Sequence, residues 1–223
     1  MGCNIAIDGP AGAGKSTIAR RVAKELSFIY VDTGAMYRAM ALYLLTKGID
    51  GASAEEIAAA CPGAEISIEY REGEQIVLLN GEKVNHRLRT EEGGNMASVS
   101  SANPKVREHL LKLQRNLAAE NDVVMDGRDI GTTILPDADI KIYLTASADT
   151  RAKRRYLELT EKKVPCDLEQ IRQDIIDRDE RDMNREVSPL RQAEDAVLVD
   201  SSEMGIDEVV ETILKLYREK AGI

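Results

Sequence analysis

Residues 5–17 have the sequence IAIDGPAGAGKST, an apolar run followed by a glycine-rich segment that ends in Lys-Ser-Thr. The apolar run at residues 4–8 predicts a buried strand, and the spacing of apolar residues over 18–26 predicts a helix. Between them, residues 9–16 match the pattern G-x-x-x-x-G-K-S/T in full. A strand before this pattern and a helix after it form the context in which the pattern binds phosphate groups.

The chemistry of this segment indicates a nucleoside triphosphate bound with Mg²⁺. Glycines allow backbone N–H groups to approach phosphate closely, and the helix N-terminus adds roughly half a positive charge. Lys15 supplies a full charge for the β- and γ-phosphates, and Ser16 supplies a hydroxyl for Mg²⁺. The predicted ATP-binding residues are Gly9, Pro10, Ala11, Gly12, Ala13, Gly14, Lys15, Ser16 and Thr17.

Predicted strands and helices alternate along most of the remaining chain. Short apolar runs predict buried strands at residues 28–31, 123–126, 140–144 and 196–199. Apolar residues at helical spacing predict helices at residues 35–47, 104–119, 148–160 and 206–220. Strands separated by helices form a parallel sheet with helices on both faces, so the expected fold class is α/β.

Residues 66–84 interrupt this alternation. Two runs with the composition of strands, 66–70 and 75–79, are joined by a short turn, and Asn80-Gly81 is a strong signal for a two-residue hairpin turn. Such a local antiparallel sheet does not continue the pattern on either side of it. We therefore expect a small β-rich insertion within the α/β domain.

The composition limits the classes of protein to which the chain can belong. Its 223 residues carry a net charge of −9, which argues against a general nucleic-acid binder with a basic surface. Cys3, Cys61 and Cys166 form no C-x-x-C pair, which fits the reducing cytoplasm and gives no zinc signature. No apolar run approaches the ~18 residues of a membrane span, and the first residues lack the features of a signal peptide. We expect a cytoplasmic protein with small-molecule partners.

The glycine-rich motif alone does not identify a reaction. A GTPase would carry an N-K-x-D guanine-binding motif, which this sequence lacks, and a motor ATPase is usually longer. A small-molecule kinase with a second anion site is the favoured class. Two alternatives stay open at this point: a kinase acting on UMP, AMP or a non-nucleotide metabolite, and a non-catalytic ATP-dependent switch.

Arginines are the residues that we expect at the second anion site, because their planar guanidinium group binds phosphate bidentately. Arg38 follows Asp-Thr-Gly at 32–34, and Arg128 follows the strand that ends at Asp126, at the carboxyl edge where parallel sheets bind ligands. Asp126 itself is a candidate to hold Mg²⁺ through water. Arg178, Arg181 and Arg185 lie at i, i+3 and i+7, so we expect them to share one face of a helix. A further cationic patch comprises Arg151, Arg154 and Arg155.

Four segments together resemble the bacterial cytidylate (CMP) kinases, which belong to the P-loop nucleoside monophosphate kinases. They are IDGPAGAGKST at 7–17, DTGAMYR at 32–38, DGRDIGT at 126–132 and RDMNR at 181–185. The resemblance runs in order from residue 4 to about 220. Ser27 stands where the family usually has Gly, and residues 92–96 match the family pattern less closely.

The resemblance implies an enzyme of pyrimidine nucleotide metabolism that transfers the γ-phosphoryl group of Mg-bound ATP to CMP or dCMP, yielding ADP and CDP or dCDP. It implies a monomer made of a single kinase domain. The domain would comprise a core at about 1–35, 105–150 and 190–223, a monophosphate-binding region with the β insertion at about 36–104, and a helical lid at about 151–190.

The resemblance also implies roles for individual residues. Ser98, Arg107 and Asp129 would bind cytosine, and Arg178 and Asp182 would bind the ribose. The phosphate of CMP would be bound by Arg38, Arg128 and Arg185, and Asp32 also belongs to the expected CMP-binding set. The expected catalytic residues are Lys15, Arg128, Arg154 and Arg185, of which Arg154 or a neighbour would contact the transferred group. The expected metal ligands are Ser16 and, through water, Asp126.

Overall fold

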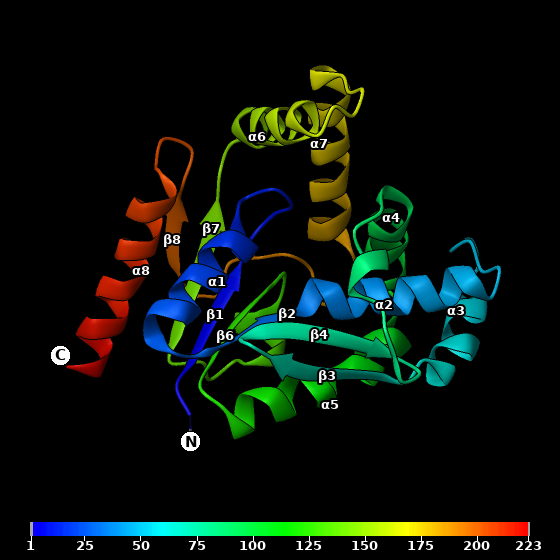
Figure 1. Cartoon of the computed structure of the whole chain (residues 1–223), viewed down its shortest axis with the longest axis horizontal. Helices are drawn as coiled ribbons and strands as arrows, with labels where there is room; N and C mark the ends of the chain where they lie inside the picture. Colours follow the sequence, from blue (N-terminus) through cyan, green and yellow to red (C-terminus); the bar gives the residue numbers. More distant parts are fainter. Residues whose placement is uncertain (1, 223) are drawn as a thin grey trace.

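The computed structural model describes residues 2–222 and contains a central five-stranded sheet (Figure 1). Its strands are β1 (Asn4–Asp8), β2 (Ile29–Asp32), β6 (Val123–Gly127), β7 (Ile140–Thr145) and β8 (Val197–Asp200). They lie in the order β2-β6-β1-β7-β8, and every neighbouring pair is parallel. The parallel α/β sheet expected from the sequence is confirmed.

Helices cover both faces of this sheet because side chains alternate along each buried strand. In β1, Ile5 and Ile7 pack into one apolar cluster and Ala6 packs into the other. The cluster with Ile5 also holds residues of α1 (Lys15–Leu26) and α8 (Ile206–Ala221). The cluster with Ala6 holds residues of α2 (Thr33–Thr46) and α5 (Pro104–Glu120). The strand before the glycine-rich segment is thus buried from both sides and fixed in position.

The β-rich insertion is a separate three-stranded antiparallel sheet, as expected. It consists of β3 (Ile66–Arg71), β4 (Glu74–Leu79) and β5 (Glu82–Lys83). The Asn80-Gly81 turn has positive φ angles of 51° and 82°, and the turn between β3 and β4 has the same property at Glu72 and Gly73. Positive φ at both central residues matches the twist of the flanking strands in two-residue hairpins.

The insertion is attached along the free edge of β2. The Gln75 side chain accepts a hydrogen bond from the Asp32 N–H at 2.8 Å and donates one to the Asp32 carbonyl at 3.2 Å. Tyr70 donates its hydroxyl hydrogen to the Tyr30 carbonyl at 3.2 Å. Side chains of the insertion therefore satisfy backbone groups that a further strand would otherwise pair.

Two helices were not expected from the sequence, namely α3 (Ala54–Ala60) and α4 (Glu91–Ser100). Gly93 and Gly94 give α4 a poor intrinsic helix propensity. A cap offsets this, because the Thr90 hydroxyl accepts a hydrogen bond from the Gly93 N–H at 3.0 Å. Burial of Met96 and Ala97 in the apolar cluster with α2 then stabilises the helix.

The remaining α-helices of residues 2–222 are α6 (Ala148–Glu161) and α7 (Leu168–Asn184), which pack against each other at the carboxyl edge of the sheet (Figure 1). Arg178 and Arg181 lie within α7, and Arg185 follows its last residue. No helix within residues 2–222 combines the length and the apolar character needed to cross a membrane.

Ser27 adopts the left-handed conformation at the C-terminal end of α1, with φ 58° and ψ 32°. A side chain in this conformation brings its Cβ close to the following carbonyl, at a cost of about 1 kcal/mol. We expect Ser27→Gly to raise the free energy of unfolding by about this amount in chemical denaturation. Ser27→Ala keeps the Cβ and serves as the control, and an equal gain in both variants would contradict the explanation.

Candidate active site

Within the glycine-rich segment, residues 9–14 form a loop of the phosphate-binding type (P-loop) between β1 and α1, and residues 15–17 form the first turn of α1. A Cβ at Gly9 would lie 1.9 Å from the Leu144 carbonyl oxygen, so only glycine allows the loop to pass this close to β7. Lys15 is buried, and its Nζ donates to the Pro10 carbonyl at 2.7 Å within the loop. Burial and the nearby Arg128 lower the pKa of Lys15. The lysine of the P-loop therefore lies within the electrostatic field of a residue from the predicted second site.

Asp126 lies at the end of β6 and is held by hydroxyl groups. Ser16 donates to one carboxylate oxygen at 3.1 Å, and Tyr30 donates to the other at 2.8 Å. Burial, with Asp32 nearby, raises the pKa of Asp126, and burial next to Asp126 raises the pKa of Tyr30. Tyr30 was not expected from the sequence, because nothing in a β-strand residue indicates which distant carboxylate its hydroxyl will contact.

The pair of Ser16 and Asp126 fits Mg²⁺. Mg²⁺ takes hard oxygen ligands and is commonly bound by one or two protein groups together with phosphate oxygens and water. The structure supplies one hydroxyl and one buried carboxylate that face each other beside the P-loop. Within residues 2–222, no group of three or more His, Cys, Asp and Glu residues is arranged to hold a metal.

Asp129 forms the centre of a second cluster, on the loop that follows β6. It pairs with Arg107 of α5 and lies 3.6 Å from an Arg185 guanidinium nitrogen. The Arg107 guanidinium also lies 5.4 Å from the centroid of the Tyr37 ring and donates to the Ser101 carbonyl at 3.1 Å. Arg107, Asp129 and Arg185 have nearly buried side chains, so the cluster is a preformed set of donors and acceptors.

Asp182 joins α7 to the loop that carries Arg128. Arg128 donates to one Asp182 oxygen at 2.8 Å, and Ser98 of α4 donates to the other at 3.4 Å. Burial alone would raise the pKa of Asp182, but Arg128, Arg178 and Arg185 together hold it below its ordinary value. Three elements that are distant in the sequence thus meet at one carboxylate.

Arg178 has no such partner. Its side chain is mostly buried, and its Nε lacks a hydrogen-bond acceptor among residues 2–222. Burial and the positive charge of Arg128 lower the pKa of Arg178 to about 10, with a further contribution from Arg38. Arg38, Arg128 and Arg178 therefore place positive charge in one region with too few carboxylates to neutralise it. An excess of positive charge of this kind attracts anions.

Arg154, which the resemblance implies as one candidate for contacting the transferred group, binds the segment after β8 in this structure, and its role stays a prediction. Its guanidinium donates to the Ser201 carbonyl at 2.6 Å and to the Ser201 hydroxyl at 3.2 Å, after β8. Arg181 also does not share the environment of Arg178 and Arg185. It is exposed and donates to the Asp177 carbonyl within its own helix. The i, i+3 spacing spans enough rotation for one side chain to face solvent while its neighbours face the cluster.

Arg151, one turn before Arg154, is the residue of α6 that contacts the P-loop. Its guanidinium donates to the Ala11 carbonyl at 2.9 Å and to Asp179 of α7 at 2.6 Å, and its Nε donates to the Ala146 carbonyl at 2.8 Å. The sequence contains a usable signal, since Arg151 is close to the end of β7 and β7 neighbours β1 in the sheet.

Asp8, immediately before the P-loop, is a second residue that the sequence analysis missed. Its carboxylate accepts hydrogen bonds from the Ile130 and Gly131 N–H groups, both at 2.7 Å. Burial raises the pKa of Asp8 to about 6, although both hydrogen bonds oppose this shift. Asp8 thereby connects the P-loop strand to the loop that carries Arg128 and Asp129.

The P-loop and the arginine cluster thus lie near each other at the carboxyl edge of the sheet, and comparisons with known proteins identify the family of the chain. A model of the family "Cytidylate kinase" matches residues 5–219. The chain belongs to the cytidylate kinase family. All four segments that carry the resemblance lie within the matched range.

Individual relatives cover nearly the whole chain. A cytidylate kinase of Caldicellulosiruptor saccharolyticus is 49% identical over 98% of this chain and 97% of its own length. A cytidylate kinase of Shouchella clausii is 47% identical over 98% and 97%. A solved structure of an uncharacterized protein from Eubacterium ventriosum has a TM-score of 0.52 at 14% identity and covers 96% of this chain and 97% of its own. That last likeness concerns the fold alone.

Arg178 carries a largely buried charge that lies close to Arg128. The substitution Arg178→Met removes this charge, so we expect the ligand-free protein to unfold at the same temperature or higher. Stabilisation by added inorganic phosphate should fall, because one cation of the anion site is lost. Thermal unfolding with and without phosphate measures both effects. Arg181→Met is the matched control on the same helix, and an equal loss in that variant would contradict the prediction.

Proposed function

We propose that the protein transfers the γ-phosphoryl group of ATP to CMP or dCMP, producing ADP and CDP or dCDP. The observation that carries the proposal is the adjoining of two cationic sites in a chain of the cytidylate kinase family. Lys15 of the P-loop lies close enough to Arg128 for each charge to affect the other. Two phosphate groups bound at these positions would face each other, which is the geometry that phosphoryl transfer needs.

In this proposal, the buried cluster around Asp129 binds cytosine. Cytosine offers an amino donor at N4 and acceptors at N3 and O2, so it needs a carboxylate or hydroxyl as well as a cationic donor. Asp129 and Arg107 supply these groups side by side, and Ser98 lies on the facing helix α4. In the absence of a base, Arg107 donates a hydrogen bond to Asp129.

Ribose and phosphate then extend toward the P-loop. Asp182 and Arg178 are proposed to bind the ribose, and Arg38, Arg128 and Arg185 to bind the phosphate of CMP. Within residues 2–222, neither Arg38 nor Arg178 forms an ion pair, which supports these roles, because an anionic substrate would supply the missing negative charge. Asp32 supports the site indirectly, since its carboxylate accepts from the Ala35 N–H at 2.9 Å and caps the helix that carries Arg38.

Catalysis in this proposal is direct in-line transfer, stabilised by positive charge. The phosphate oxygen of CMP is already a nucleophile, so no general base is required. Lys15, Arg128 and Arg185 would neutralise the negative charge on the phosphoryl group in the transition state. When bound, Mg²⁺ would neutralise phosphate charge beside Ser16 and Asp126. On the ATP side, the contact with the P-loop favours Arg151 over Arg154 as the cation of α6 that acts there.

Each region of the chain has a proposed role in this reaction. We propose a core at about 1–35, 105–150 and 190–223, a monophosphate-binding region at about 36–104 and a lid at about 151–190. Movement of the last two toward the core would exclude water, which otherwise competes with CMP as the acceptor. We further propose a monomer in the cytoplasm, and the three free cysteines support a reducing compartment.

An acceptor panel tests the proposed reaction. In the presence of ATP and Mg²⁺, we expect ADP release to be stimulated strongly by CMP and dCMP, and weakly by UMP or AMP. Lys15→Ala should abolish the stimulated release while circular dichroism remains that of the wild type. ADP formation that no acceptor stimulates would indicate a switch, and a preference for another acceptor would indicate a different kinase.

Asp129→Asn tests how the base is bound. An asparagine that presents its amide N–H₂ would donate to uracil O4 and would lose the acceptor for the cytosine amino group. We expect the ratio of kcat/KM for CMP to that for UMP to fall about 10–100-fold. The KM for ATP should not change. A loss shared equally by CMP, UMP and ATP would contradict the role in base binding.

A further inference from the structure

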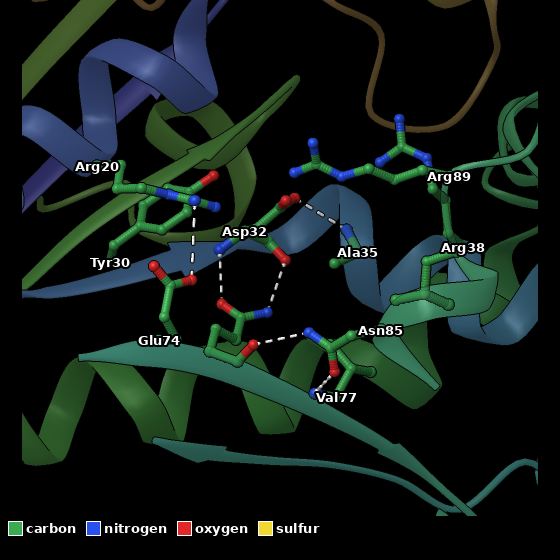
Figure 2. A pocket seen from close by; sticks show the side chains of 11 residues that line it. Arg20, Tyr30, Asp32, Ala35, Arg38, Glu74, Val77, Asn85 and Arg89 are labelled. Carbon is green, nitrogen blue, oxygen red and sulfur yellow. Dashed lines mark hydrogen bonds and ion pairs between the residues drawn. The ribbon is translucent and has the colours of Figure 1, made fainter. Parts of the chain in front are cut away.

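Tyr30 of β2 lines a cavity of about 270 Å³ beside the insertion (Figure 2). Residues of β2, α2 and β4 are among those that line this cavity. Only 6% of Tyr30 is exposed, and its hydroxyl donates to the buried carboxylate of Asp126 at 2.8 Å. A phenylalanine ring would fill the same apolar space, so the hydroxyl needs an explanation of its own.

The fold places Tyr30, Asp126 and Ser16 on one face of the parallel sheet. Tyr30 lies opposite Val124 in the register of β2 with β6, and Asp126 comes two residues after Val124, so the three side chains point to the same face. Tyr30 and Val124 pack into the same apolar cluster as residues of α1. The first turn of α1 carries Ser16, so this helix brings a second hydroxyl to the carboxylate.

Each oxygen of the Asp126 carboxylate is held by a different hydroxyl. Tyr30 donates to Oδ1, and Ser16 donates to Oδ2 at 3.1 Å. The Thr33 hydroxyl donates to the Asp126 carbonyl at 2.7 Å and so fixes the backbone at this residue. An aspartate carboxylate otherwise rotates over a broad range of χ2 angles. Hydrogen bonds to both oxygens restrict that rotation.

The orientation of Asp126 determines which atoms of Ser16 remain for Mg²⁺. A serine hydroxyl has one hydrogen and two lone pairs. Ser16 gives its hydrogen to Asp126, so its lone pairs remain for a metal ion. Each Asp126 oxygen also keeps acceptor capacity for metal-bound water. Rotation of the carboxylate away from Ser16 would remove the acceptor of the hydroxyl hydrogen and disturb this arrangement.

Tyr30 is itself held by residues of α1 and of the insertion. The Arg20 guanidinium lies 5.3 Å from the centroid of the Tyr30 ring and 3.7 Å from a Glu74 carboxylate oxygen (Figure 2). The Tyr70 hydroxyl donates to the Tyr30 carbonyl at 3.2 Å. The ring, the backbone and the hydroxyl of Tyr30 are thus each fixed by a different partner.

We propose that Tyr30 is a positioning residue for the Mg²⁺ that accompanies ATP. Its hydroxyl keeps the Asp126 carboxylate in the orientation that accepts the Ser16 hydrogen, so that both residues can bind the hydrated metal without rearrangement. The inference rests on the proposed function for the binding of Mg-bound ATP, and it does not depend on the identity of the acceptor. Tyr30 acts through Asp126 and has no assigned contact with the nucleotide or the metal.

Tyr30→Phe tests the inference, because it keeps the ring and removes only the hydroxyl. Calorimetry measures binding of the non-hydrolysable ATP analogue AMP-PNP, once with excess Mg²⁺ and once with EDTA. We expect Mg²⁺ to strengthen binding to the wild type. In Tyr30→Phe, the affinity in EDTA should stay unchanged, which also shows that the variant is folded. The gain in affinity from Mg²⁺ should fall about 10-fold, as expected when a residue that orients a metal-binding group is lost.

Tyr70→Phe is the matched control. It also loses a tyrosine hydroxyl, which donates to the backbone of Tyr30 and not to Asp126, so its gain from Mg²⁺ should equal that of the wild type. Asp126→Ala removes the carboxylate through which Tyr30 acts. Adding Tyr30→Phe to Asp126→Ala should therefore cause no further loss of the gain from Mg²⁺.

The outcomes separate this inference from the proposed function. If Tyr30→Phe keeps the full gain from Mg²⁺, loses affinity equally in Mg²⁺ and EDTA, or matches Tyr70→Phe, the role of Tyr30 is wrong while the kinase stands. If Mg²⁺ does not strengthen binding to the wild type, the proposed metal site fails and the inference fails with it. A wild type that binds AMP-PNP with Mg²⁺ and does not phosphorylate CMP would overturn the proposed acceptor, and the binding measurements would still decide the role of Tyr30.

Discussion

Positive charge held at the carboxyl edge of the parallel sheet is the constraint on which the site depends. Arg107, Arg128, Arg178 and Arg185 lie around Asp129 and Asp182, and much of the group is withdrawn from water. Burial and repulsion within such a group cost stability, and both lower the pKa of Arg178, burial more than repulsion by Arg128. The surrounding fold offsets this cost by burying apolar surface on both faces of the sheet. An anionic ligand would relieve the repulsion, so the ligand-free protein is already organised for binding.

The framework of the fold could be predicted from the sequence because its signals are local. The strand before the P-loop, the glycine motif and the Asn80-Gly81 turn each depend on neighbouring residues, and the structure contains all three. The helix α4 was missed because Gly93 and Gly94 oppose it locally. Its stability comes from a cap and from burial against α2, neither of which periodicity reveals.

The candidate site was predictable to the extent that it follows a family pattern. Ser98, Arg107, Asp129 and Asp182 lie together as the resemblance implies, and their roles remain predictions. The resemblance left either Arg154 or a neighbour for the transferred group, and in the structure it is the neighbour Arg151 that contacts the P-loop. Contacts across long sequence separations were also hidden. Asp8 and Ile130 are 122 positions apart, and their hydrogen bond follows from the pairing of β1 with β6.

The attachment of the insertion along β2 has a consequence for self-association. An outermost strand with open backbone groups can recruit a strand from another molecule and start aggregation. The Gln75 amide occupies both the N–H and the carbonyl of Asp32, and the Tyr70 hydroxyl occupies the Tyr30 carbonyl. The antiparallel insertion therefore covers the outer edge of β2, where another chain could otherwise pair, and it also forms one wall of the cavity. A chain in which this small sheet has not yet docked would leave the edge of β2 exposed, so that a strand of another copy could pair with it.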